Sequence, residues 1–179
     1  LWRWLQRNDP ARAARAAHAM TCADWIGYCL TGEIATDFSN ATIPFLDLQN
    51  RAYSTDAVAA MGCETLAPLL AEPRPADSAL GHVTAAAATA TGLPKGVSVN
   101  VPTLDLAAMI EGMGLQQPGE SMFIMGTTAV VNILTDHVVP TARPVGASAL
   151  HASSDAIIRI FAPTTGASAY DWFAGLHPL

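Results

Sequence analysis

Charged residues are scarce in this chain: they make up 13% of 179 residues, and the basic ones are dispersed. With a net charge of −6, no basic stripe is present that could displace counterions from a nucleic-acid backbone. No apolar run approaches the ~20 residues that a membrane-spanning helix needs. We therefore expect a protein that binds neither nucleic acid nor membrane.

Cysteine is also scarce, with only Cys22, Cys29 and Cys63. An odd, sparse set argues against a disulfide framework and fits a reducing cytoplasm. Cys22 and Cys29 are seven positions apart, so the sequence has no CxxC zinc spacing, and the five histidines are scattered. The GxxxxGK[ST] pattern of a P-loop is absent too. We expect no protein-built metal site.

Apolar residues make up 51% of the chain, which is typical of a globular protein. Helices are predicted to begin at caps Asp9, Thr21 with Asp24, and Ser54. Strands are predicted around 81–83, in a buried "GVSVNV", in a hairpin "SMFIMGTTAVVNIL" and in "AIIRIFAP". "EIATDFSNATIPFLDLQNRAYS" is expected to be strand and turn, with a polar centre from Thr36 to Asn40, and "AEPRPADS" a proline-rich surface loop. The order predicts an α/β or α+β protein with mixed sheets and a boundary near 115–121. Both ends of the sequence have helix-like patterns, so we expect a piece of a longer chain.

Asp105 is the first candidate for chemistry, because it lies between the predicted strand "GVSVNV" and a small-residue helix. An acid after a strand and at a helix start points into the crevice where α/β proteins bind ligands. A carboxylate there can accept a proton from a hydroxyl. Asp is also a preferred helix cap, and the local pattern leaves both interpretations open.

Three further segments carry polar residues at turns. Gly126, Thr127 and Thr128 lie in a predicted hairpin turn, whose N–H groups could form an anion-binding concavity or only close the hairpin. Gly166 precedes a predicted helix in "TTGASAYDWF", a pattern that fits a phosphate site or a plain helix start. The cluster Thr36–Thr42 could position a ligand or simply form a hydrogen-bonded turn.

In this order, the segments "LTGEIATDFSNAT", "TGLPKGVSVNVPTLDLAAMIEGMG", "MGTTA" and "TTGASAYDWF" resemble the FGGY family of carbohydrate kinases. The resemblance implies an actin-like, ribonuclease-H-like ATPase fold, with two domains flanking a cleft and only partly present here. Residues 1–115 would be the later part of the sugar-binding domain, and 120–179 the start of the ATP-binding domain.

The resemblance also implies the roles of the candidates. Asp105 would be the catalytic acid, and Gly126, Thr127, Thr128 and Gly166 would contact the nucleotide. ATP and Mg²⁺ would be the cofactors, and the substrate a xylulose-, ribulose- or erythritol-like sugar or polyol. Many members of the family are dimers, so a homodimer is one expected assembly.

One feature departs from the family pattern. Many members have glycine close before the catalytic acid, whereas here the lead-in is Val101-Pro102-Thr103-Leu104. This bulkier lead-in could mark another substrate or reduced activity. Two other hypotheses stay open at this point: a non-catalytic sugar- or nucleotide-binding relative of the same fold, and an actin-like assembly protein.

Overall fold

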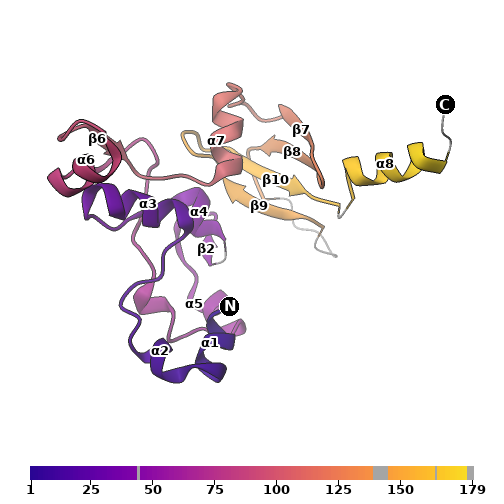
Figure 1. The fold of residues 1–179 in the computed structure, drawn as a ribbon. Helices are drawn as coiled ribbons and strands as arrows, with labels where there is room; N and C mark the ends of the chain where they lie inside the picture. The colour runs from indigo at the N-terminus through magenta and orange to yellow at the C-terminus, as the bar shows by residue number, and fades with distance from the viewer. Residues whose placement is uncertain (44, 139–144, 164, 177–179) are drawn as a thin grey trace. The chain divides into compact units, whose positions relative to one another are not determined.

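The computed structural model describes residues 1–43, 45–138, 145–163 and 165–176, which form two compact units. The first unit is Leu1–Asp105 and the second is Leu106–Leu179 (Figure 1). The functional assignment of 1–115 and 120–179 to a sugar-binding and an ATP-binding domain stays a prediction. No helix among the described residues is long and apolar enough to cross a membrane.

One part of the first unit is a small helical cluster. It is built from α1 (Trp2–Asn8), α2 (Pro10–Ala14), α5 (Thr55–Ala60), the 3₁₀ helix η1 (Ala67–Leu69) and the hairpin of β2 (Leu46–Asp47) and β3 (Ala52–Tyr53). Phe45, Val58 and Cys63 are its buried core, and Trp2 and Tyr53 pack against them. The apolar side chains of the short elements are thus buried against each other, which compensates for their low intrinsic stability.

The other part of the first unit is organised around α3 (Cys22–Thr31). This helix packs on the antiparallel pair of β5 (Ala79–His82) and β6 (Ser98–Asn100) and on α6 (Ala85–Thr91). Gly27 permits the close approach, because a Cβ there would lie 2.7 Å from Leu80 Cδ2 and 2.8 Å from Pro102 Cγ. The core beneath the helix is Ala35, Leu80 and Val101.

The helix starts predicted from capping residues are confirmed. The Asp9 side chain accepts the N–H of Arg12, and Ser54 caps α5. Thr21 and Asp24 form a reciprocal capping box at the start of α3. Each of these interactions spans only three residues, so the local sequence is enough to specify it.

Three predictions on the first unit need correction. "GVSVNV" is not a buried strand: β6 covers only Ser98–Asn100, and Ser98, Asn100 and Val97 are exposed. "EIATDFSNATIPFLDLQNRAYS" contains the strands β1 (Thr36–Asp37), β2 and β3, but its polar centre forms the helix α4 (Phe38–Thr42), with Asp37 as its cap. "AEPRPADS" is mostly loop, as predicted, but it contains β4 (Pro73–Arg74), which pairs in parallel with β1.

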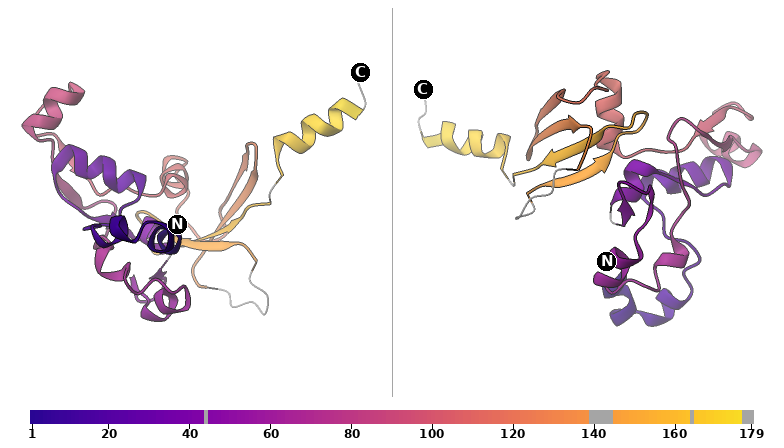
Figure 2. Two further views of the ribbon diagram at one scale, coloured as in Figure 1. Left: turned by 60° about the horizontal axis from the view of Figure 1, so that its bottom comes forward. Right: turned by 180° about the vertical axis from the view of Figure 1, so that it is seen from behind.

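The second unit contains a four-stranded antiparallel sheet in the order β7-β8-β10-β9 (Figures 1 and 2). The strands are β7 (Ser121–Met125), β8 (Ala129–Thr135), β9 (Ala147–Leu150) and β10 (Ile157–Phe161). The β7–β8 hairpin and β10 were predicted, whereas β9 was not. Ile158 and Leu134 are fully buried partners on β10 and β8.

Two helices complete this unit, α7 (Asp105–Gly112) and α8 (Ala167–Leu176). The buried His151, just after β9, ties the chain beyond α7 to the sheet. Its Nδ1 accepts the N–H groups of Ser153 and Ser154, so Nε2 carries the proton and donates to the carbonyl of Leu115 (2.9 Å). The turn between α7 and β7 is held by Glu120, whose carboxylate accepts the N–H groups of Gln116 and Gln117.

Candidate active site

Asp105 is the first residue of α7, and its side chain is exposed. It lines a pocket of about 320 Å³ within the first unit. That volume lies at the lower end of the roughly 300–1,000 Å³ typical of small-molecule sites. An exposed carboxylate keeps its hydration, so the chain does not bury this acid in an apolar interior.

The walls of this pocket come from three segments that are far apart in the sequence. They are the start of α3, the end of α4 and the lead-in to α7, and the lining residues are Thr21, Cys22, Ala23, Asn40, Ile43, Thr103 and Leu104. The pocket thus offers hydroxyl, thiol and amide groups beside one carboxylate. The sequence pointed to Asp105 and to the Thr36–Thr42 cluster, but it did not indicate that α3 contributes Thr21 and Cys22.

A second cavity of about 150 Å³ adjoins this pocket and shares Thr21, Asn40 and Ile43 with it. Asp24 lines this cavity and is 3% exposed. Burial raises the pKa of its carboxyl, and this effect outweighs the hydrogen bonds from Thr21, which lower the pKa. Burial, with a smaller contribution from the charge of Asp24, raises the pKa of Tyr53 to about 12. Both groups therefore lose their protons at a higher pH than they would in water.

The second candidate element is the turn Gly126–Thr128 between β7 and β8. Thr127 and Thr128 are exposed, and Gly126 is half-buried. Within the described residues we find no hydrogen bond donated by the N–H groups of Thr127 and Thr128. Exposed hydroxyls and open main-chain donors are what an anion site at such a turn requires.

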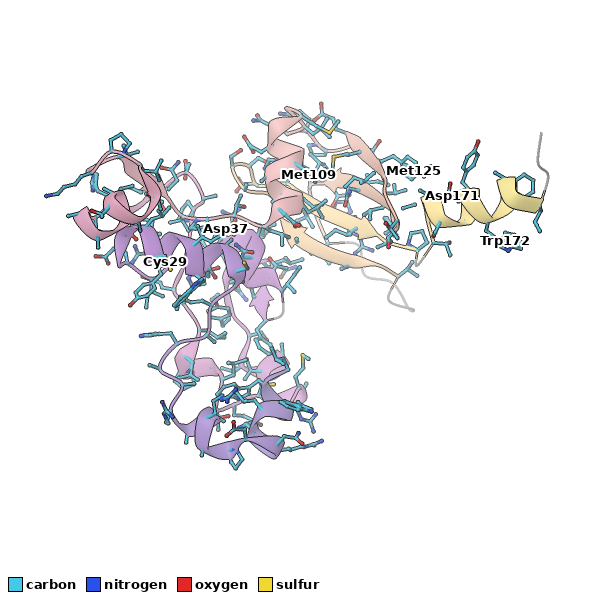
Figure 3. The ribbon with its side chains drawn as sticks, viewed as in Figure 1. Cys29, Asp37, Met109, Met125, Asp171 and Trp172 are labelled. Atoms are coloured by element: carbon cyan, nitrogen blue, oxygen red, sulfur yellow. The ribbon has the colours of Figure 1, made fainter. Side chains whose placement is uncertain are left out.

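Gly166 lies directly against this turn. The N–H of Ala167, the first residue of α8, donates to the carbonyl of Gly126 (2.8 Å), and the N–H of Ala129 donates to the carbonyl of Thr165 (3.3 Å). A Cβ on Gly166 would lie 2.5 Å from Gly126 O and Ala129 N. Figure 3 labels Met125, which precedes the turn, and Asp171 and Trp172 on α8. The structure therefore brings together the four residues predicted to contact a nucleotide.

Asp105 belongs to the first unit and the turn to the second. That the two face each other across a cleft stays a prediction, as do the roles of all five residues. Within the described residues, no group of three or more His, Cys, Asp or Glu side chains could hold a metal ion.

Comparison with known proteins adds independent findings. Residues 1–110 match the model for the N-terminal domain of the FGGY family of carbohydrate kinases. An autoinducer-2 kinase of Yersinia enterocolitica is 33% identical over 152 residues, which are 76% of this chain and 28% of that protein. A probable L-xylulose kinase of Pasteurella multocida is 26% identical over 172 residues, 96% of this chain and 36% of that protein.

Among solved structures, a xylulose kinase from Rhodospirillum rubrum superposes with a TM-score of 0.86 at 27% identity. The match covers 99% of this chain and 36% of that one. The chain thus spans roughly a third of the length of the relatives it matches.

Proposed function

The chain belongs to the FGGY family of carbohydrate kinases, and we propose that the protein transfers a phosphoryl group from ATP to a hydroxyl of a small ketose or polyol. The family and the actin-like fold inferred from the sequence motifs are confirmed by the comparisons. The observation that best supports the activity is the exposed Asp105 carboxylate in a pocket of about 320 Å³. Such a pocket can admit a hydroxyl compound to within hydrogen-bond reach of a base.

Each candidate residue has a role in this proposal. Asp105 accepts the proton of the attacking hydroxyl, or at least orients it. The N–H groups and hydroxyls of Thr127 and Thr128 hold phosphoryl oxygens, because preorganised donors stabilise the charge that develops there. Gly166 keeps the turn in place and leaves the anion room beside the main chain.

ATP and Mg²⁺ fit the residues that are present. Mg²⁺ supplies charge neutralisation at the nucleotide phosphates, and it typically needs only one or two carboxylates besides phosphates and waters. The exposed threonines of the turn offer neutral donors that suit a phosphate chain.

The substrate we propose is xylulose-, ribulose- or erythritol-like. L-xylulose and autoinducer-2 belong in the same screen, because the names of two relatives specify them. We further propose that 1–115 and 120–179 belong to the sugar-binding and ATP-binding domains. A cytoplasmic location and a homodimer complete the proposal.

The test is Asp105→Asn in the full-length protein, with ADP release measured by a coupled assay over pentuloses, polyols and autoinducer-2. We expect turnover to fall by at least the ~10²-fold typical of a lost general base. Asp56→Asn is the matched control, because Asp56 is also an exposed acid in the first turn of a helix. Near-wild-type turnover of Asp105→Asn would refute the role of Asp105.

The alternative is a non-catalytic relative that binds sugar or nucleotide, since a fold does not guarantee activity. Titration calorimetry separates the two. Binding of ATP and a sugar by the wild-type protein without any ADP release would overturn the kinase proposal.

A further inference from the structure

Asp37, which Figure 3 labels, is 1% exposed, and its carboxylate accepts four hydrogen bonds. Its carboxylate accepts the N–H of Ser39 (3.1 Å), the N–H of Asn40 (2.8 Å) and the hydroxyl of Ser39 (2.6 Å). These three donors are local and cap α4. A fourth donor is the hydroxyl of Thr103, at 2.8 Å from Oδ2 and 66 residues further along the chain.

The neighbours of Thr103 are held by the same helical turn. The N–H of Leu104 donates to Ser39 Oγ (3.1 Å), and Asn40 Nδ2 donates to the carbonyl of Pro102 (3.1 Å). Three consecutive residues therefore each make a hydrogen bond to α4 or its cap. Asp105 comes immediately after them.

Two hydroxyls meet at one oxygen in this network. Both the Ser39 and the Thr103 hydroxyls lie within donating distance of Asp37 Oδ2. The two hydroxyl oxygens also lie 2.9 Å from each other, and either could be the donor in that contact. Asp37 and Ser39 therefore both hold the Thr103 hydroxyl in place.

Thr103 also belongs to the pocket, since it lines the same wall as Leu104 and Asp105. It thus connects the buried Asp37 with the surface that would receive substrate. A residue without a hydroxyl at this position would leave the Asp37 carboxylate without its fourth donor.

We propose that Asp37 and Thr103 are positioning residues for Asp105: the buried carboxylate holds the Thr103 hydroxyl and so fixes the main chain that presents the catalytic acid. This inference rests on the proposed function of Asp105. Neither residue needs to touch the substrate. Their effect is to hold the Asp105 carboxylate where the attacking hydroxyl arrives, and a displacement of about 1 Å there can cost about 10²-fold in rate.

The decisive variants are Thr103→Val, which removes the hydroxyl but keeps the shape, and Thr103→Ser, which keeps the hydroxyl. In the full-length protein we expect Thr103→Val to lower kcat by about 10-fold or more, with KM for the sugar changed less than about 2-fold. Thr103→Ser should restore most of the lost kcat. Thr89→Val is the control, because the exposed Thr89 hydroxyl only donates to the carbonyl of Ala85 within α6.

A purely structural role would give another pattern. Thr103→Val would then lower the midpoint of thermal unfolding while kcat stayed at the wild-type value, and that outcome overturns the proposal. A failure of the serine variant to restore kcat would overturn it as well, because the hydroxyl would not be the relevant group.

A second measurement does not depend on activity. Hydrogen exchange of the Leu104 amide reports directly on whether the lead-in is held to Ser39. Loss of one hydrogen bond to the network should speed this exchange by about 5-fold in Thr103→Val and leave it near wild type in Thr103→Ser. If the wild-type protein turns over no substrate, the proposed function fails. The exchange measurement still tests the positioning inference separately, because an unchanged exchange rate of the Leu104 amide in Thr103→Val would overturn it.

Discussion

Gly166→Ala tests the contact between α8 and the turn Gly126–Thr128. The added Cβ would lie 2.5 Å from both Gly126 O and Ala129 N, about 0.9 Å short of the 3.4 Å at which a Cβ makes ordinary contact. It would also lie 2.7 Å from the carbonyl carbon of Thr128. All three atoms belong to the main chain, so no side-chain rotation relieves the overlap. The turn or the start of α8 has to move.

A displacement of this size is large for a phosphate site. Forced overpacking typically costs 1–3 kcal/mol, and a misplacement of about 1 Å can lower the rate about 10²-fold. We therefore expect Gly166→Ala to lower kcat/KM for ATP by roughly 10²-fold, while the affinity for the sugar stays near the wild-type value. The assay is coupled ADP release with ATP varied at saturating sugar, and calorimetry gives the sugar affinity.

The control is Gly175→Ala in the same helix, where an added Cβ would meet no atom within 4 Å. Alanine inside a helix is favoured over glycine by about 1 kcal/mol, so this variant should be as active as wild type and no less stable. If Gly166→Ala keeps its kcat/KM for ATP within about 3-fold of wild type, the turn does not bind the nucleotide phosphates.

Two further predictions concern stability. Ile158→Ala, at a side chain with 0% exposure in the four-stranded sheet, should cost about 2–5 kcal/mol in urea unfolding, and a loss below about 1 kcal/mol would contradict the described core. Tyr53 donates to the carbonyl of Ala71, and burial raises its pKa from 10.0 to about 12. Its contribution to stability is therefore complete below pH 10 and lost as the pH rises towards 12. Tyr53→Phe should flatten that decline in a pH series of denaturation midpoints, and an unchanged decline would assign it to other groups.

The parts of the fold that the sequence predicted are those specified over a few residues. Thr21 and Asp24, which are three positions apart, together cap α3. The Gly126–Thr127 turn was predicted from the short hairpin pattern around it. The segments that resemble the FGGY family could be recognised because each is a short run of residues and their order along the chain is visible in the sequence. Asp105 was singled out by its place between two apolar segments, and the structure does leave it exposed.

The parts that were missed depend on contacts between distant residues. The apolar residues of "GVSVNV" indicated burial, yet in the described part of the chain β6 pairs with β5 alone, and Ser98 and Asn100 are exposed. The parallel pairing of β1 with β4 joins Thr36 to Pro73, and no local pattern encodes that register. The link from Asp37 to Thr103 spans 66 residues and was invisible for the same reason.

The lead-in to Asp105 shows how such distant contacts change the interpretation of a departure from a family pattern. Val101 is 3% exposed in the core with Leu80, and the ring of Pro102 lies against Gly27 of α3. The Thr103 hydroxyl donates a hydrogen bond to Asp37. Val101, Pro102 and Thr103 are therefore each fixed by a different interaction. Ordering a flexible residue costs about 1–2 kcal/mol, and this segment has already lost that freedom in the fold.

A rigid lead-in bears on the two explanations that the sequence left open for it, another substrate and reduced activity. Reduced activity would be expected if the bulky residues had disturbed the acid, whereas here the side chains of Val101, Pro102 and Thr103 are held within the first unit and fix the main chain before it. Leu104 also lines a pocket wall that a glycine directly before the acid would leave empty. Under the proposed role of Asp105, we therefore expect the departure from glycine to change the substrate and not to abolish the activity.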